Sequence, residues 1–245
     1  EASLRRLAEA LHQRDMGLIM DIVPNHMAVD NANPWWQDVL QWGAASPYAG
    51  FFDITWRSQD QFMRDRLLSP ILRSDYLEVL KAGELRLAFE AASGSFFVTH
   101  FDHRLPLAMA SYADILAPAG NDALTRIADR CAALEKEFSA HAIGAQIRQE
   151  LATAVTGDTL QELERALQRF EPATAEGCLR LHNLLERQHY RLASWRTAND
   201  EINWRRFFDV NELISLRAEQ PRVFEATHCK IFELIEAGLI DGLRI

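Results

Sequence analysis

The hydrophobic positions at the start of the chain predict a helix followed by a strand. Leucines recur at helical spacing over residues 4–11, with charged and amide residues between them. Gly17 stands where a helix end favours a residue that accepts positive φ. The apolar stretch 18–23 follows it directly, which is typical of a buried strand.

The end of the chain repeats this order. Pro221 fits the first turn of a helix, apolar residues continue the helical stripe to residue 235, and Gly238 ends it. The stretch 239–245 again predicts a strand. A helix, a glycine and a buried strand, occurring twice, predict α/β units that share a parallel sheet.

The residues between these units are too many for a loop, so they predict folded insertions. Residues 27–118 mix short apolar strands with glycine and serine turns, whereas helical stripes dominate 119–198. One stripe runs over 124–138 and includes Phe138, and the last runs over 181–195. We therefore divide the chain into an α/β unit at 1–26, an α+β subdomain at 27–118, an all-helical subdomain at 119–198 and a returning α/β unit at 199–245. The chain as a whole is predicted to be mainly helical.

Charge and cysteine content narrow the class of protein. The net charge of −9 argues against a nucleic-acid or anionic-membrane partner and suits an uncharged substrate. Three cysteines without a C-x-x-C pair predict neither a disulfide framework nor a zinc site, so we expect a reducing, cytoplasmic setting. Because the chain begins at Glu1 and ends at Ile245 inside a predicted strand, we expect an internal fragment.

The first candidate for chemistry is the end of the first strand. In a parallel α/β barrel, functional side chains lie where strands end, and Asn25 and His26 fall at that point. Asp21 and Asn25 share one face of the strand. A buried Asp21 would need a partner, which Asn25 or a cation across the barrel could provide. The alternative is a strand end capped by polar residues without function.

The second candidate is Arg244, which shares a strand face with Gly242. An arginine inside a barrel requires a carboxylate partner. The next position on that face follows Ile245, and an Asp there would be kept ionised by Arg244 as a nucleophile. The alternative is a structural ion pair.

Aromatic residues gather after His26, and flat rings with polar neighbours suit the faces of sugars. Trp35 and Trp36 are the better candidates for a binding cleft, whereas Phe51 and Phe52 favour the core. In the segment 203–209, Arg205 and Arg206 stand beside aromatic residues, and Arg206 is our candidate for ligand binding. Pairing of these arginines with acids is the alternative.

His100, Asp102 and His103 could suggest a metal, but no further ligand follows them at a recognisable spacing. We therefore expect no metal and no cofactor.

These motifs together resemble a known family. Residues 21–26 (DIVPNH) and 241–245 (DGLRI) are similar to the first and second signature regions of the α-amylase superfamily, glycoside hydrolase family 13. More specific segments resemble the maltooligosyltrehalose synthases: 25–40, 46–56, 101–107, 184–196 and 201–213. This resemblance implies the third and fourth strands of a (β/α)8 barrel, with the long insertion between them.

The resemblance implies a (1→4)-α-D-glucan 1-α-D-glucosylmutase of trehalose biosynthesis. Such an enzyme converts the reducing-end α-1,4 bond of a maltooligosaccharide into an α,α-1,1 bond by retaining transfer within one substrate. It further implies that Asp21 and Asn25 support the site, that His26 binds the sugar, and that Arg244 holds a nucleophilic Asp directly after Ile245. The nucleophile and the acid/base Glu would lie outside this chain, so we expect the chain alone to be inactive.

Three other interpretations remain open at this point. An α-glucan hydrolase or a branching enzyme of the same superfamily would share both signature regions. A non-catalytic carbohydrate-binding protein could use a decayed barrel, and the residue after Ile245 would distinguish it from an enzyme. A metal hydrolase using Asp21 and His26 has too few ligands in this sequence.

Overall fold

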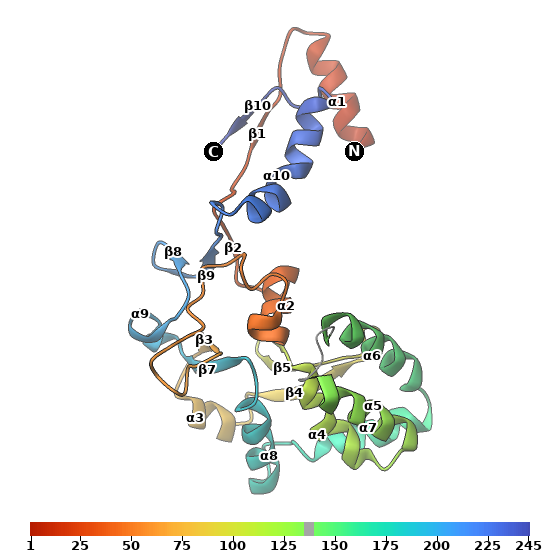
Figure 1. Ribbon diagram of the computed structural model, residues 1–245. Coiled ribbons are helices and arrows are strands. Elements are labelled where there is room, and N and C mark those ends of the chain that lie inside the picture. The colour runs from red at the N-terminus through yellow and green to blue at the C-terminus, as the bar shows by residue number, and fades with distance from the viewer. Residues whose placement is uncertain (135–139) are drawn as a thin grey trace.

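The computed structural model describes residues 1–134 and 140–245, so Phe138 of the predicted stripe lies outside the described residues. The molecule is elongated, with a small unit at one end and a larger body at the other (Figure 1). Both termini lie in the small unit. The small unit consists of α1 (Ala2–His12), β1 (Ile19–Asp21), α10 (Pro221–Glu236) and β10 (Gly242–Arg244).

The predicted parallel pairing of the two α/β units is confirmed. β1 and β10 form a parallel two-stranded sheet in which Ile19 lies opposite Gly242 and Asp21 lies opposite Arg244. A small core holds the two units together through Ala8, Leu234, Leu239 and Ile240. Both strands are shorter than the apolar stretches that predicted them. One reason is that Pro24 follows β1 closely and cannot donate to a ladder.

Three sheets lie in the larger body and at its junction with the small unit. A three-stranded sheet in the order β2-β9-β8 consists of β2 (His26–Ala28), β9 (Val210–Ser215) and β8 (Arg206–Phe207). The parallel pair is β3 (Leu67–Leu72) with β7 (Tyr190–Ser194). The antiparallel sheet is β4 (Arg86–Glu90), β5 (Ser95–His100) and β6 (His103–Pro106).

Helices cover these sheets and extend beyond them (Figure 1). They are α2 (Pro34–Trp42), α3 (Tyr76–Lys81), α4 (Tyr112–Leu116), α5 (Asp122–Ala133), α6 (Ala140–Ala154), α7 (Asp158–Gln168), α8 (Ala175–Leu185) and α9 (Ala198–Glu201). Short 3-10 turns occur at Gly43–Ala45, Met109–Ser111, Ala117–Ala119 and Trp195–Thr197. Asparagine caps begin two of the helices, because the side chains of Asn33 and Asn121 accept backbone N–H groups of the first turns of α2 and α5.

The last predicted helical stripe was wrong beyond residue 185. α8 ends at Leu185, and residues 190–194 form β7 beside β3. Burial alternates along β7, with Tyr190, Leu192 and Ser194 buried. Leucine spacing alone could not separate a helix from a strand here, because the pairing partner β3 is distant in sequence.

The mixed and helical insertions share one core. Phe96 and Tyr112 of the first belong to the same buried cluster as Leu124, Ile147 and Leu181 of the second. Contact between the two is close at Gly94, where an added Cβ would lie 2.0 Å from the backbone oxygen of Arg148. The larger body is therefore held together by apolar packing across the two insertions.

Candidate functional site

Asp21 and Arg244 form an ion pair at the ends of the two parallel strands. They are opposite one another in register, and the Arg244 guanidinium donates a hydrogen bond to the Asp21 carboxylate. A cation on the neighbouring strand is therefore the partner of Asp21. The prediction of a buried strand was wrong for β1, whose end residues are exposed, and the side chains of Asp21 and Arg244 are 62% and 76% exposed. Only one of the five N–H donors of Arg244 goes to Asp21, so others remain for a second acceptor.

Asn25 pairs with His26 rather than with Asp21. The Asn25 Oδ1 lies 2.8 Å from the His26 Nδ1. Because an amide oxygen only accepts, Nδ1 carries the proton and Nε2 of the neutral ring is an acceptor for a hydroxyl group. The backbone also fixes this position, since Leu216 N donates to Asn25 O at 2.9 Å and His26 lies opposite Ser215 in β2 and β9.

The β8–β9 hairpin packs against one face of the His26 ring. Phe207 stacks on His26 with ring centroids 3.9 Å apart and an interplanar angle of 15°. Phe208 meets Phe207 edge to face at 4.5 Å, and its side chain points to solvent with 81% of its area exposed. Sequence reasoning noted the segment 203–209 but missed these two phenylalanines. Two consecutive phenylalanines in a segment rich in aromatic and charged residues could have identified them as candidates.

Arg206 is committed to contacts within the protein. Its side chain is 11% exposed and donates to Asn199 Oδ1 at 3.0 Å, Asn211 Oδ1 at 2.7 Å and Asp209 Oδ1 at 3.2 Å. A largely buried guanidinium with several acceptors fixes the conformation of the hairpin. Direct binding of substrate by Arg206 stays a prediction.

The two candidate tryptophans have different environments. Trp36 is 2% exposed and meets the rings of Phe52 and Trp204, so the structure places it in the core and not in an open cleft. Trp35 is half-buried and lies edge to face with Phe51 at 4.9 Å. The predicted core positions of Phe51 and Phe52 are confirmed. Substrate contact by Trp35 stays a prediction.

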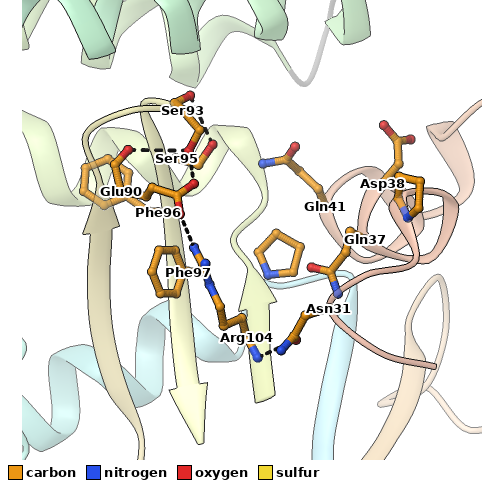
Figure 2. A pocket seen from close by; sticks show the side chains of 12 residues that line it. Asn31, Gln37, Asp38, Gln41, Glu90, Ser93, Ser95, Phe96, Phe97 and Arg104 are labelled. Atoms are coloured by element: carbon orange, nitrogen blue, oxygen red, sulfur yellow. Dashed lines mark hydrogen bonds and ion pairs between the residues drawn. The ribbon is translucent and has the colours of Figure 1, made fainter. Parts of the chain in front are cut away.

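A polar pocket of about 430 Å³ lies between α2 and the β4–β6 sheet (Figure 2). Arg104 extends over the Phe97 ring and donates to Glu90 at 2.9 Å, while Gln37 and Gln41 come from α2 on the opposite wall. The Ser93 hydroxyl, followed by Arg104, lowers the pKa of Glu90. The lowered pKa and the bond to Arg104 keep the Glu90 carboxylate ionised and paired on this wall of the pocket. Its lining residues are scattered from 31 to 106, so no local motif predicted it.

A smaller cavity of about 220 Å³ lies beside β9. Trp195, Trp204 and Glu212 line it, together with a small part of Trp36. The ring faces and a carboxylate give it the mixed character of a ligand cavity. None of the candidate residues 21–26 lines this cavity.

Over residues 1–134 and 140–245, no three His, Cys, Asp or Glu side chains are grouped so that they would hold a metal ion. Within the same ranges, none of the helices has the length and apolar character needed to cross a membrane.

The chain is similar over nearly its whole length to maltooligosyltrehalose synthases. A Mycobacterium tuberculosis protein that is provisionally named maltooligosyl trehalose synthase is 30% identical over 252 residues, which cover 99% of this chain and 21% of the relative. The solved structure of the Arthrobacter ramosus enzyme is 31% identical, with a TM-score of 0.58 over 98% of this chain and 22% of that one. No family model matches the chain.

A further crystal structure of a maltooligosyl trehalose synthase is 28% identical, with a TM-score of 0.61 over 100% of this chain and 23% of that one. The resemblance recognised in the sequence is therefore confirmed. The chain spans about a fifth of the length of these relatives.

Proposed function

We propose that this chain is the part of a maltooligosyltrehalose synthase that supplies the third and fourth strands of its (β/α)8 barrel and the insertion between them. The observation that carries this proposal is the Asp21–Arg244 pair at the ends of two parallel strands, with Asn25 and His26 directly after the first. In barrel enzymes, the active site is built at this end of the strands.

In this proposal, the substrate is a maltooligosaccharide, and the whole enzyme makes an α,α-1,1 bond for trehalose biosynthesis. Retaining transfer needs two carboxyl groups about 5–5.5 Å apart, a nucleophile and an acid/base. The nucleophile is expected directly after Ile245 and the acid/base in a later part of the barrel. Arg244 then orients the nucleophile through its remaining N–H donors while Asp21 holds the guanidinium from the other side.

His26 binds the substrate through its free ring nitrogen. With Nδ1 bonded to Asn25, Nε2 accepts a hydrogen bond from a sugar hydroxyl. Stacking on Phe207 prevents the ring from turning away. This contact requires no charge on the substrate, in keeping with the net charge of −9. A cytoplasmic setting, in which cysteines stay reduced, is part of this proposal.

The test is to incubate the full-length enzyme that contains this chain with maltopentaose and to follow reducing ends and chain length. A fall in reducing ends without shortening is expected, because the new bond joins two anomeric carbons. A rise would instead identify a hydrolase, and an unchanged substrate would identify a binding protein. The same assay on the 245-residue chain should show no turnover, since the proposed nucleophile and acid/base are not among its residues.

A further inference from the structure

The tip of the β8–β9 hairpin displays one phenylalanine in an unusual backbone conformation. Phe208 has φ of 52°, a left-handed value that bulky residues adopt only when their surroundings impose it. The flanking pair in the ladder is Phe207 with Val210. A glycine or an asparagine would fit this turn with less strain, so the turn itself does not explain a phenylalanine here.

Two contacts impose this conformation. On one side, the buried Arg206 guanidinium binds Asn199, Asp209 and Asn211 and fixes the base of the hairpin. On the other side, Phe207 stacks on His26 and ties the hairpin to the proposed sugar-binding residue. Phe208 is thereby held one ring away from His26, with its face open to solvent.

We propose that Phe208 is a specificity-determining residue that retains the freed glucose during the transfer reaction. This inference rests on the proposed function. In the first step, the bond between C1 of the donor sugar and O4 of the terminal glucose breaks. The enzyme carboxylate takes C1, and the acid/base gives its proton to O4. In the second step, O1 of the same glucose attacks C1, its proton returns to the acid/base, and the carboxylate leaves.

Between these steps, the glucose must turn so that O1 replaces O4 at the reacting carbon. Hydrogen bonds would hold it in its first orientation, because they are directional. An aromatic face attracts the C–H surface of a sugar without fixing its rotation. The apolar Phe208 ring also excludes water from C1, where water would otherwise hydrolyse the intermediate and release glucose. Retention and exclusion of water both favour the α,α-1,1 product.

The test uses Phe208→Gly in the full-length enzyme and measures the ratio of released glucose to α,α-1,1 product from maltopentaose. Glycine removes the ring and relieves the left-handed strain, so the variant is expected to fold. Loss of one aromatic contact should raise this ratio by roughly 3- to 10-fold. Phe208→Tyr keeps the ring and should restore the wild-type ratio.

Phe101→Gly is the matched control. Phe101 is also an exposed phenylalanine in a hairpin turn, with φ of 50°, but its ring contacts Arg73 and His100 instead of the residues around His26. The ratio should stay at the wild-type value in this variant. An equal rise for Phe101→Gly would show a general effect of hairpin loosening and would overturn the inference.

The remaining outcomes separate this inference from the function on which it rests. If the wild-type enzyme forms no α,α-1,1 product, the proposed function fails and the role of Phe208 fails with it. If the product forms and Phe208→Gly leaves the ratio unchanged, only the role of Phe208 is overturned. A lower melting temperature and turnover with an unchanged ratio would identify Phe208 as a packing residue of the hairpin.

Discussion

Arg244 donates a hydrogen bond to Asp21 across the β1–β10 pair, although 223 positions separate the two residues in sequence. Parallel pairing places both at the ends of their strands. Because both side chains are largely exposed, their ion pair contributes less than about 1 kcal/mol to stability. In the proposed enzyme, the pair would instead position the nucleophile.

The first prediction concerns this pair. Asp21→Asn should lower the free energy of unfolding of the chain by less than about 1 kcal/mol in urea titration. Arg244→Lys in the full-length enzyme should lower kcat by roughly 100-fold or more, with a much smaller change in KM, because a lysine lacks the planar fork that orients a carboxylate. Arg205→Lys, at an exposed arginine of a loose ion pair, is the control. An Arg244→Lys enzyme with kcat near the wild-type value would contradict the positioning role.

The second prediction concerns Arg206. Arg206→Ala should destabilise the chain by about 1–2 kcal/mol, because it removes a largely buried guanidinium that donates to exposed Asn199 and part-buried Asn211. The neighbouring Arg205 is 74% exposed, so Arg205→Ala should change stability by less than about 0.5 kcal/mol. Urea titration of both variants measures the difference. Equal effects would show that Arg206 does not anchor the hairpin.

The third prediction concerns the close contact between the β4–β5 turn and α6. An added Cβ at Gly94 would lie 2.0 Å from the Arg148 backbone oxygen, and Gly94 has φ of 60°. Gly94→Ala should therefore cost about 2–4 kcal/mol, from overpacking and backbone strain together.

Gly157→Ala is the control for this prediction. Gly157 has φ of 55° but nothing within 4 Å of an added Cβ, so its cost should be the backbone term alone, about 1 kcal/mol. Thermal unfolding of the two variants gives both values. Similar costs would mean that the mixed and helical insertions do not approach one another at Gly94.

The fourth prediction concerns pH. Burial lowers the pKa of His100 from 6.5, reinforced by His103 and Arg73 and only partly opposed by the backbone and carboxylate of Glu84. As the pH falls, His100 of the unfolded chain therefore takes up a proton at a higher pH than His100 of the folded chain. This contribution to stability is complete above pH about 6.5 and is lost as the pH falls below that value.

The free energy of unfolding should accordingly fall as the pH drops below about 6.5, and the fall should be smaller in His100→Gln. His12→Gln serves as the control, because His12 is exposed in the small unit. Urea titrations across this pH range measure the slopes. An unchanged slope in His100→Gln would show that other groups cause the acid sensitivity.

Local patterns were sufficient to predict several parts of the fold. The repeated order of helix, glycine and strand predicted the two α/β units and their parallel pairing, which the β1–β10 register confirms. The place of Asn25 and His26 after the first strand was also correct. By contrast, the leucine spacing around Leu192 predicted a helix where β7 pairs with β3, because the period of a short apolar segment does not identify its partner.

By itself, the sequence determined which residues have the chemistry of the candidate site and that they lie at or directly after the ends of two strands. The hydrophobic period and the positions of glycine and proline act over a few residues, so the sequence alone predicts the helices, strands and turns that depend on them. Tertiary structure decided the partners. It paired Asp21 with Arg244, stacked Phe207 on His26, and buried Arg206 and Trp36. Those outcomes depend on the register between strands and on packing between segments distant in sequence, neither of which a local pattern specifies.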